Sequence, residues 1–224
     1  MEKETTQNKL EFLVALYIGL LAIAELMGGK TFPLVNLFGY QLNASTAIFV
    51  MPFLFTINDI ITEVFGAHRT RRIIRYGFVV IAIFTICALV FTALPPSGRF
   101  ASSEQSYDQI FFQSARISIA SLLAFAVSEF TDVFIFVKIR NKLGKRALWL
   151  RNNVSNIIGQ LLDTVVFMTL AFYALDKPFA TNWAFLVSII LPYWLIKCSV
   201  SILETPFVYL GVSWLRKNTT GKRG

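Results

Sequence analysis

The sequence predicts an all-helical integral membrane protein, a bundle of six transmembrane helices with both termini in the cytoplasm. Hydrophobic residues make up 55% of the 224 residues, and the mean hydropathy is +0.61. Six apolar stretches each approach or exceed the roughly 20 residues that an α-helix needs to cross about 30 Å of hydrocarbon. Basic residues gather at alternate ends of these stretches. This composition does not fit a soluble domain.

The six predicted spans form one membrane domain over residues 1–224 and are joined by short connections. Some spans are longer than a bilayer requires, so they must tilt, kink or emerge from it. The longest outer connection begins with Pro95 and Pro96, which cannot continue a helix. Another outer connection, 30–41, is rich in Phe, Pro and Gly, and we expect it to pack at the membrane interface. The predicted spans are 10–27, 42–65, 73–94, 110–137, 154–175 and 183–214.

The formal charge of +8 reflects topology rather than nucleic-acid binding. Lys and Arg are concentrated in the connections on one side of the predicted spans. The opposite connections carry only Lys30, Arg99 and Lys177. The positive-inside rule therefore places both termini in the cytoplasm, as an even number of spans requires.

The first two spans carry carboxylates at membrane depth. Glu25, near the outer end of span one, is either an interface anchor or a gate. Asp59 and Glu63 in span two are four residues apart and face the same way. Two carboxylates one turn apart are not both readily ionised at low dielectric, so one is protonated, a cation lies between them, or a substrate donates hydrogen bonds to them. Alternatively, they lie at the membrane surface and pair with Arg69, Arg71 or Arg72.

Span four repeats this pattern near the cytoplasmic end. Glu129 and Asp132 are three residues apart, and Lys138 and Arg140 are structural partners available beyond them. Arg116, one turn into the helix from the other side, either extends outward to the interface or contacts the substrate.

Span five carries a polar stripe that no lipid-facing helix would present. Asn152, Asn156, Gln160, Asp163 and Thr164 recur at spacings that place them along one helical face. Each amide side chain offers a donor and an acceptor, so the stripe can bind the edge of a planar heterocycle or can link neighbouring helices.

Span six carries Lys197, Ser201 and Glu204 on one face, between Pro192 and Pro206, which can kink or open the helix. A lysine at mid-span needs a counter-charge. The aromatic rings beside it, Tyr193 and Trp194, either stack on a flat substrate or serve packing. Four carboxylates are candidates for the counter-charge: Asp59, Glu129, Asp163 and Glu204.

Two sequence features together resemble the queuosine precursor transporter family of bacteria, formerly described as vitamin-uptake transporters. One is the run Asn-Asp-Ile-Ile-Thr-Glu-Val-Phe-Gly at 58–66, and the other is the stripe of Asn156, Gln160, Asp163 and Thr164. The resemblance implies a six-helix bundle similar to the substrate-binding subunits of energy-coupling-factor transporters. It also implies import of 7-deazaguanine compounds, for a modified nucleoside of transfer RNA, across the bacterial inner membrane.

The expected partners are therefore a small-molecule 7-deazaguanine base and the lipid bilayer, without direct contact to nucleic acid. A homo-oligomer is compatible with the sequence. A guanine-like edge presents N–H donors that carboxylate and amide side chains accept well. The predicted substrate-binding residues are Asp59, Glu63, Glu129, Asp132, Asn156, Gln160, Asp163, Trp194, Lys197 and Glu204.

Other classes of function fit less well. His68, the only histidine, lies in an Arg-rich loop, and the sequence has no nucleophile or zinc-protease motif, so we predict no enzymatic activity, cofactor or metal. The alternative is a substrate-binding subunit of an ATP-driven vitamin or nucleobase uptake complex. Coupling to protons through Asp59, Glu63 or Asp163 and facilitated diffusion are both compatible with the residues.

Overall fold

The computed structural model describes the backbone of residues 2–143, 148–203 and 205–216, and the side chains of 4–128, 131, 158–197, 199 and 206–215. This part of the chain is mostly helical, but the prediction of an all-helical fold is wrong, because two strands form a β-hairpin. It contains seven α-helices, one two-stranded hairpin and one 3₁₀ turn. The elements are α1 (Glu2–Met27), β1 (Thr31–Leu37), β2 (Tyr40–Ser45), η1 (Thr46–Phe49), α2 (Met51–Phe65), α3 (Ala67–Phe91), α4 (Glu104–Leu143), α5 (Leu148–Phe172), α6 (Phe179–Leu203) and α7 (Thr205–Arg216).

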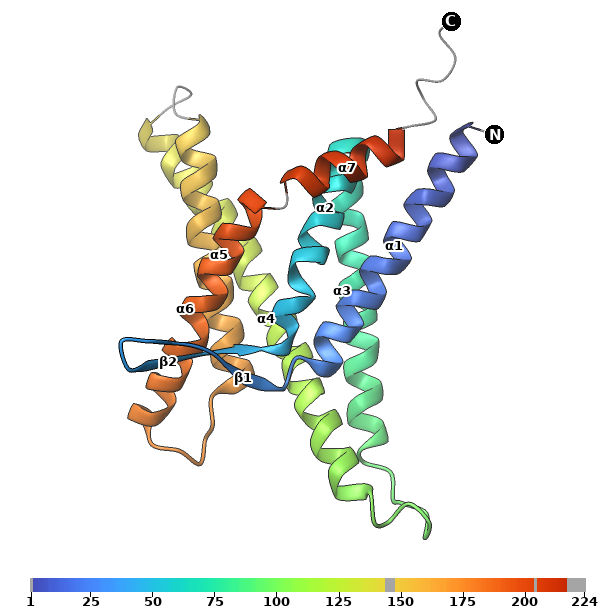
Figure 1. The fold of residues 1–224 in the computed structure, drawn as a ribbon, viewed down its shortest axis with the longest axis vertical. Coiled ribbons are helices and arrows are strands. Elements are labelled where there is room, and N and C mark those ends of the chain that lie inside the picture. Colours follow the sequence, from blue (N-terminus) through green and yellow to red (C-terminus); the bar gives the residue numbers. More distant parts are fainter. Residues whose placement is uncertain (1, 144–147, 204, 217–224) are drawn as a thin grey trace, which may run out of the picture.

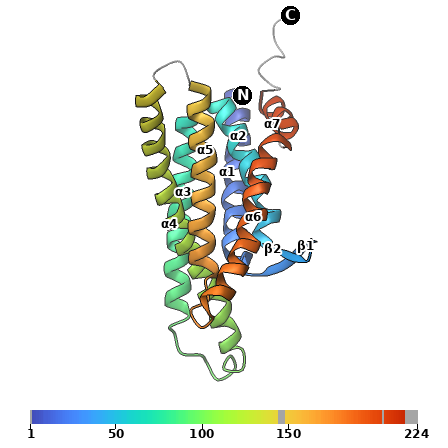
Figure 2. The same cartoon turned by 90° about the vertical axis from the view of Figure 1, so that its left-hand side faces the viewer.

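The long helices run roughly along one direction, as Figure 2 shows. In Figure 1, α1, α2 and α3 lie on one side of the molecule and α5 and α6 on the other. Helix α4 joins the two groups, because it packs against α1, α3 and α5. Helix α7 crosses one end of the molecule and packs on α2 (Figure 1).

Four helices in the described part of the chain are long and apolar enough to cross a membrane. They cover 4–27, 67–91, 104–128 and 179–197. Two shorter apolar segments, Ile158–Phe172 of α5 and Pro206–Leu215 of α7, do not reach that length. The predicted total of six spans stays a prediction.

The prediction of one continuous helix over 42–65 is wrong. Residues 40–45 form strand β2, which pairs antiparallel with β1, and α2 begins only at Met51. At 15 residues, α2 is about 22 Å long. An apolar run does not by itself distinguish a buried strand from a helix. Here Ser45 ends the strand, since its hydroxyl donates to the Gly28 carbonyl (2.6 Å) and accepts from the Ala47 amide (3.2 Å).

The outer connection 30–41 is part of this hairpin rather than an irregular loop. Its two-residue turn places Phe38 at φ 52° and Gly39 at φ 85°, the left-handed pair that tight hairpins favour. Strand β2 packs on α6, where the Tyr40 hydroxyl donates to the Ala184 carbonyl (2.6 Å) and the Asn43 amide to the Ser188 hydroxyl (2.9 Å). Its position at the outer membrane interface stays a prediction.

The single predicted span 183–214 is also wrong, because the helix divides into α6 and α7. Helix α6 ends at Leu203, and α7 begins at Thr205 and takes a different direction (Figure 1). Pro206 accounts for this division, because it has no backbone N–H to donate to the Ile202 carbonyl of a continuous helix, whereas the first turn of a new helix does not need that donor. The other proline of this region, Pro192, lies inside α6.

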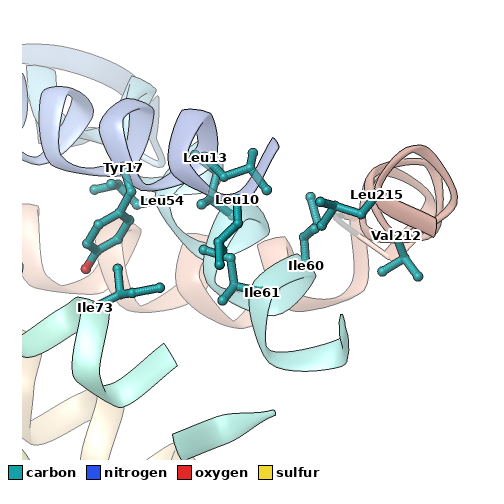
Figure 3. Close-up of a cluster of buried hydrophobic side chains, with 10 residues drawn as sticks. Leu10, Leu13, Tyr17, Leu54, Ile60, Ile61, Ile73, Val212 and Leu215 are labelled. Carbon is teal, nitrogen blue, oxygen red and sulfur yellow. The ribbon is translucent and has the colours of Figure 1, made fainter. Parts of the chain in front are cut away.

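A cluster of buried apolar side chains joins the two ends of the chain. Figure 3 shows side chains from α1, α2, α3 and α7 meeting at one end of the bundle. Beside this cluster the Lys9 ammonium donates to the Trp214 carbonyl at 2.6 Å. The start of α1 and the end of α7 therefore lie on the same side of the molecule. The labelled members of the cluster are Leu10, Leu13, Tyr17, Leu54, Ile60, Ile61, Ile73, Val212 and Leu215.

Single cysteines test the predicted orientation of this end. In a variant without the native cysteines, cysteine at Lys142 or Lys222 should react with a membrane-impermeant maleimide only when the cytoplasmic face is accessible. Cysteine at Ser102, between α3 and α4, should react from outside in intact cells. The expectation follows from the excess of Lys and Arg on one side. The opposite labelling at any of these positions would contradict the orientation.

Candidate functional site

A cavity of about 150 Å³ lies between six of the helices. Every helix from α1 to α6 contributes at least two side chains to its wall, so the fold as a whole builds this cavity. Most of the wall is apolar, and a few polar side chains converge on it, which is the usual character of a small-molecule site. The lining residues are Leu21, Ala24, Glu25, Met51, Leu54, Phe78, Ile81, Ser121, Ala124, Phe125, Asp163, Thr164, Phe167, Met168, Tyr193 and Lys197.

An ion pair between α5 and α6 forms the first polar part of the wall. The Lys197 ammonium lies 2.6 Å from Oδ2 of Asp163 and also donates to the Thr164 hydroxyl at 3.1 Å. That hydroxyl donates in turn to the Gln160 carbonyl at 2.7 Å, so its lone pairs face the ammonium. The Lys197 side chain is 11% exposed and that of Asp163 is 30% exposed. Asp163 thus supplies the counter-charge that Lys197 requires, and it is one of the four carboxylates predicted for that role.

The second polar part of the wall is Glu25 on α1. This residue is only 5% exposed. The hydroxyls of Ser118 and Ser121 on α4 lie beside its carboxyl group. Nevertheless, Oε2 of Glu25 and Oγ of Ser118 have no hydrogen-bond partner in the described part of the structure. Buried polar atoms are nearly always paired, so an unpaired carboxylate oxygen on a cavity wall marks a position where a ligand can bind.

Aromatic side chains form much of the remaining wall. The rings of Phe78 and Phe125 are tilted against each other with centroids 4.0 Å apart. Tyr193 on α6 is 3% exposed, and its hydroxyl has no partner among the described residues. Of the two rings proposed for stacking, Tyr193 lines the cavity, whereas Trp194 is not among its lining residues. A binding role for Trp194 stays a prediction.

The other predicted site residues do not meet at this cavity where their side chains are described. Asp59 and Glu63 are exposed on the last turns of α2 and are not among the lining residues. Gln160 is half-buried one turn from Asp163 and is also absent from the wall. The side chains of Glu129, Asp132, Asn156 and Glu204 lie outside the described residues. Substrate contacts by these residues stay predictions.

Arg116 has a structural role at the end of α5. Its guanidinium donates to the carbonyl of Leu170 at 2.9 Å and to that of Tyr173 at 2.5 Å. The last carbonyls of a helix lack partners within the helix, so a cationic side chain stabilises them. This contact across α4 and α5 explains the charge without a substrate.

Comparison with known proteins assigns the chain to a family. Residues 45–211 match the family described as "Putative vitamin uptake transporter". The chain belongs to this family. The matched residues include α2 to α6 and most of α7, so they cover the ion pair of Asp163 and Lys197, whereas α1 with Glu25 lies before them.

Three relatives of this chain carry more specific names. A "Probable queuosine precursor transporter" of Bacillus subtilis is 30% identical over 176 residues, which are 78% of this chain and 73% of the relative. A protein of the same name from Haemophilus influenzae is 31% identical over 65% of this chain and 59% of its own length. The "Queuosine precursor transporter" of Escherichia coli is 29% identical over 66% of this chain and 64% of its own length.

These relatives and the apolar helices show that the chain is a multi-pass membrane protein of a transporter family. No solved structure matches the chain significantly. The expected similarity to the binding subunits of energy-coupling-factor transporters therefore stays a prediction.

Proposed function

We propose that this protein imports queuosine precursors, 7-deazaguanine bases used in transfer RNA modification, across the bacterial inner membrane. The observation that carries the proposal is the cavity shared by six helices, with an ion pair and a further carboxylate at its wall. Ionisable groups inside a membrane are costly, and they typically mark a substrate or ion path. The names of the three relatives supply the class of substrate.

The chemistry of the cavity suits a flat, nitrogen-rich base. Phe78, Phe125, Phe167 and Tyr193 offer aromatic surface for stacking. The carboxylates accept hydrogen bonds from N–H groups, and charge-assisted bonds of this kind are the stronger ones. A solvent-poor wall strengthens these contacts, because water does not compete for the same groups.

The volume of the cavity also restricts the substrate. About 150 Å³ is the size of an engineered protein cavity that holds one benzene ring. A bicyclic 7-deazaguanine is larger than one ring, so the helices around the cavity must separate when it enters. Such a widening is compatible with a transporter, in which a central site opens alternately to the two sides.

Uptake by the purified chain alone tests this proposal. The protein is reconstituted into liposomes without any ATPase, and entry of a radiolabelled 7-aminomethyl-7-deazaguanine is followed over time. We expect uptake above that of protein-free liposomes, inhibited by excess unlabelled 7-deazaguanine and not by thymine. Repeating the assay with an imposed pH gradient shows whether protons drive accumulation.

Two results would contradict the proposal. Binding of the base without uptake, with uptake restored only by an ATPase component, would instead support a substrate-binding subunit of an ATP-driven complex. If the correctly folded protein shows no binding and no uptake of the base, the queuosine precursor assignment is wrong.

A further inference from the structure

The charges on the cavity wall do not balance. Among the lining residues, Glu25, Asp163 and Lys197 carry acidic or basic side chains, which gives a formal charge of −1 when all three are ionised. Lys197 already donates to Asp163 and to Thr164, so its ammonium is engaged on the α5 and α6 side. The excess negative charge therefore belongs to Glu25 on α1.

Glu25 is buried, and one of its two carboxylate oxygens lacks a hydrogen bond from the described residues, although the Ser118 and Ser121 hydroxyls lie beside the group. Its Oε2 atom accepts no hydrogen bond within the described part of the chain, although the residue is only 5% exposed to solvent. Removing an ionised carboxylate from water costs several kcal/mol unless donors or a cation compensate it. A ligand that brings N–H donors to this oxygen would supply the missing compensation.

A second unpaired group lies on the same wall. The hydroxyl of Tyr193 on α6 is buried and has no partner among the described residues. A phenol can donate its hydrogen to a carbonyl oxygen. The cavity thus presents an acceptor oxygen from α1 and a hydroxyl from α6, and neither atom has a hydrogen-bond partner among the described residues. The nearest hydroxyls are those of Ser118 and Ser121 for Glu25 and that of Ser45 for Tyr193.

We propose that Glu25 recognises the substrate by accepting two hydrogen bonds from a ring N–H and the adjacent exocyclic amine, with Tyr193 donating to the neighbouring carbonyl. This inference rests on the proposed function and names the residues that select the base. A carboxylate has two oxygens in the spacing that two parallel N–H groups require. The 2-amino-4-oxopyrimidine edge of a 7-deazaguanine carries these donors and this carbonyl side by side. The pairing also disfavours anionic ligands, because the cavity already has an excess negative charge.

Competition binding tests the inference independently of transport. A labelled 7-aminomethyl-7-deazaguanine is bound to the purified protein in detergent and displaced by 7-deazaguanine or by its 2-deamino analogue, 7-deazahypoxanthine. In the unmodified protein we expect 7-deazaguanine to bind roughly 5- to 150-fold more tightly, because the analogue leaves a buried acceptor unpaired. In Glu25→Gln we expect the two bases to bind about equally or the preference to reverse. The NH₂ group of the glutamine side chain would then face one of the two N–H donors of 7-deazaguanine, and two donors repel each other.

Two further variants make the pattern specific. Tyr193→Phe should weaken both competitors by a similar factor and preserve the preference, since both carry the carbonyl. Glu11→Gln, an exposed position on the same helix, is the matched control and should behave as the unmodified protein. If Glu25→Gln does not accumulate as folded protein, Glu25→Asp replaces it, and we expect it to weaken 7-deazaguanine more than its analogue.

The outcomes separate the inference from the proposed function. A preference that survives in Glu25→Gln, or equal binding of the two bases to the unmodified protein, would overturn the role of Glu25 and leave the transport of deazaguanines intact. Normal binding and preference in Glu25→Gln together with lost uptake would overturn it as well, in favour of a proton-carrying role. Displacement by neither base would overturn both the inference and the proposed function.

Discussion

Replacing Lys197 by methionine, or Asp163 by asparagine, is expected to reduce uptake of the precursor base by roughly 10- to 150-fold. Each change removes one partner of the 2.6 Å pair between α5 and α6 and leaves the other charged group at the cavity wall. Hydrogen bonds to charged groups contribute about 1.5–3 kcal/mol, which corresponds to that range. The upper part of the range is expected for Lys197→Met, because it leaves Asp163 uncompensated on the wall of a cavity that a second carboxylate, Glu25, also lines. Uptake into cells or liposomes, per amount of folded protein, measures the effect.

Two controls separate function from folding in this experiment. Lys177→Met and Asp176→Asn make the same chemical changes at exposed positions between α5 and α6, so they should leave uptake unchanged. The double variant Asp163→Asn with Lys197→Met removes both charges. Any loss of folded protein in the single variants should therefore be recovered in the double variant, whereas uptake should stay low. Loss of uptake in proportion to loss of folded protein would show that the ion pair serves stability. Normal uptake in Lys197→Met would show that the ion pair has no role in transport.

The sequence was most informative where a charge required a partner. A lysine within an apolar span needs a counter-charge, and four carboxylates of the predicted spans were candidates for it. Asp163 could be anticipated because it lies on the polar face of α5 with Thr164, and both contact Lys197 in the structure. Such a requirement holds for any arrangement of the helices, so it can be read before the fold is known.

Glu25 was considered in the sequence only as an anchor or a gate. Its neighbours along the chain are apolar, and the side chains that face it, Ser118 and Ser121, come from α4, nearly one hundred residues away. Long-range contacts of this kind leave no local pattern. The available signal was the carboxylate itself, within a helix apolar enough to cross a membrane.

The predicted spans were wrong where an apolar run is compatible with more than one secondary structure. Residues 42–45 lead into the apolar run of α2, but they pair with β1, and this pairing depends on the turn at Phe38 and Gly39. The division between α6 and α7 was better signalled, because Pro206 limits helix continuation. Hydropathy alone nevertheless joined α6 and α7 into one span, since both are apolar.

Replacing Asn182 by alanine is expected to lower the stability of the protein by about 1–3 kcal/mol. Its buried side chain accepts a hydrogen bond from the Ala174 amide at 2.8 Å and donates to the carbonyls of Ala174 at 2.7 Å and Lys177 at 3.0 Å. Each neutral hydrogen bond contributes about 0.5–1.5 kcal/mol, and water at the exposed loop replaces part of the loss. By the scaling for soluble proteins of this size, the melting temperature should fall by about 2–4 °C per kcal/mol.

These hydrogen bonds of Asn182 matter for the site because they fix the end of α5 against the start of α6. These two helices carry Asp163 and Lys197, so a looser connection allows their ion pair to shift. We therefore expect Asn182→Ala to reduce uptake by a smaller factor than Lys197→Met, and to recover part of it at lower temperature. Thr181→Ala, a neighbouring exposed position, is the control and should change neither property. An unchanged melting temperature in Asn182→Ala would contradict the stabilising role of these hydrogen bonds. A fall in stability without any change in uptake would show that the ion pair does not depend on the hydrogen bonds of Asn182.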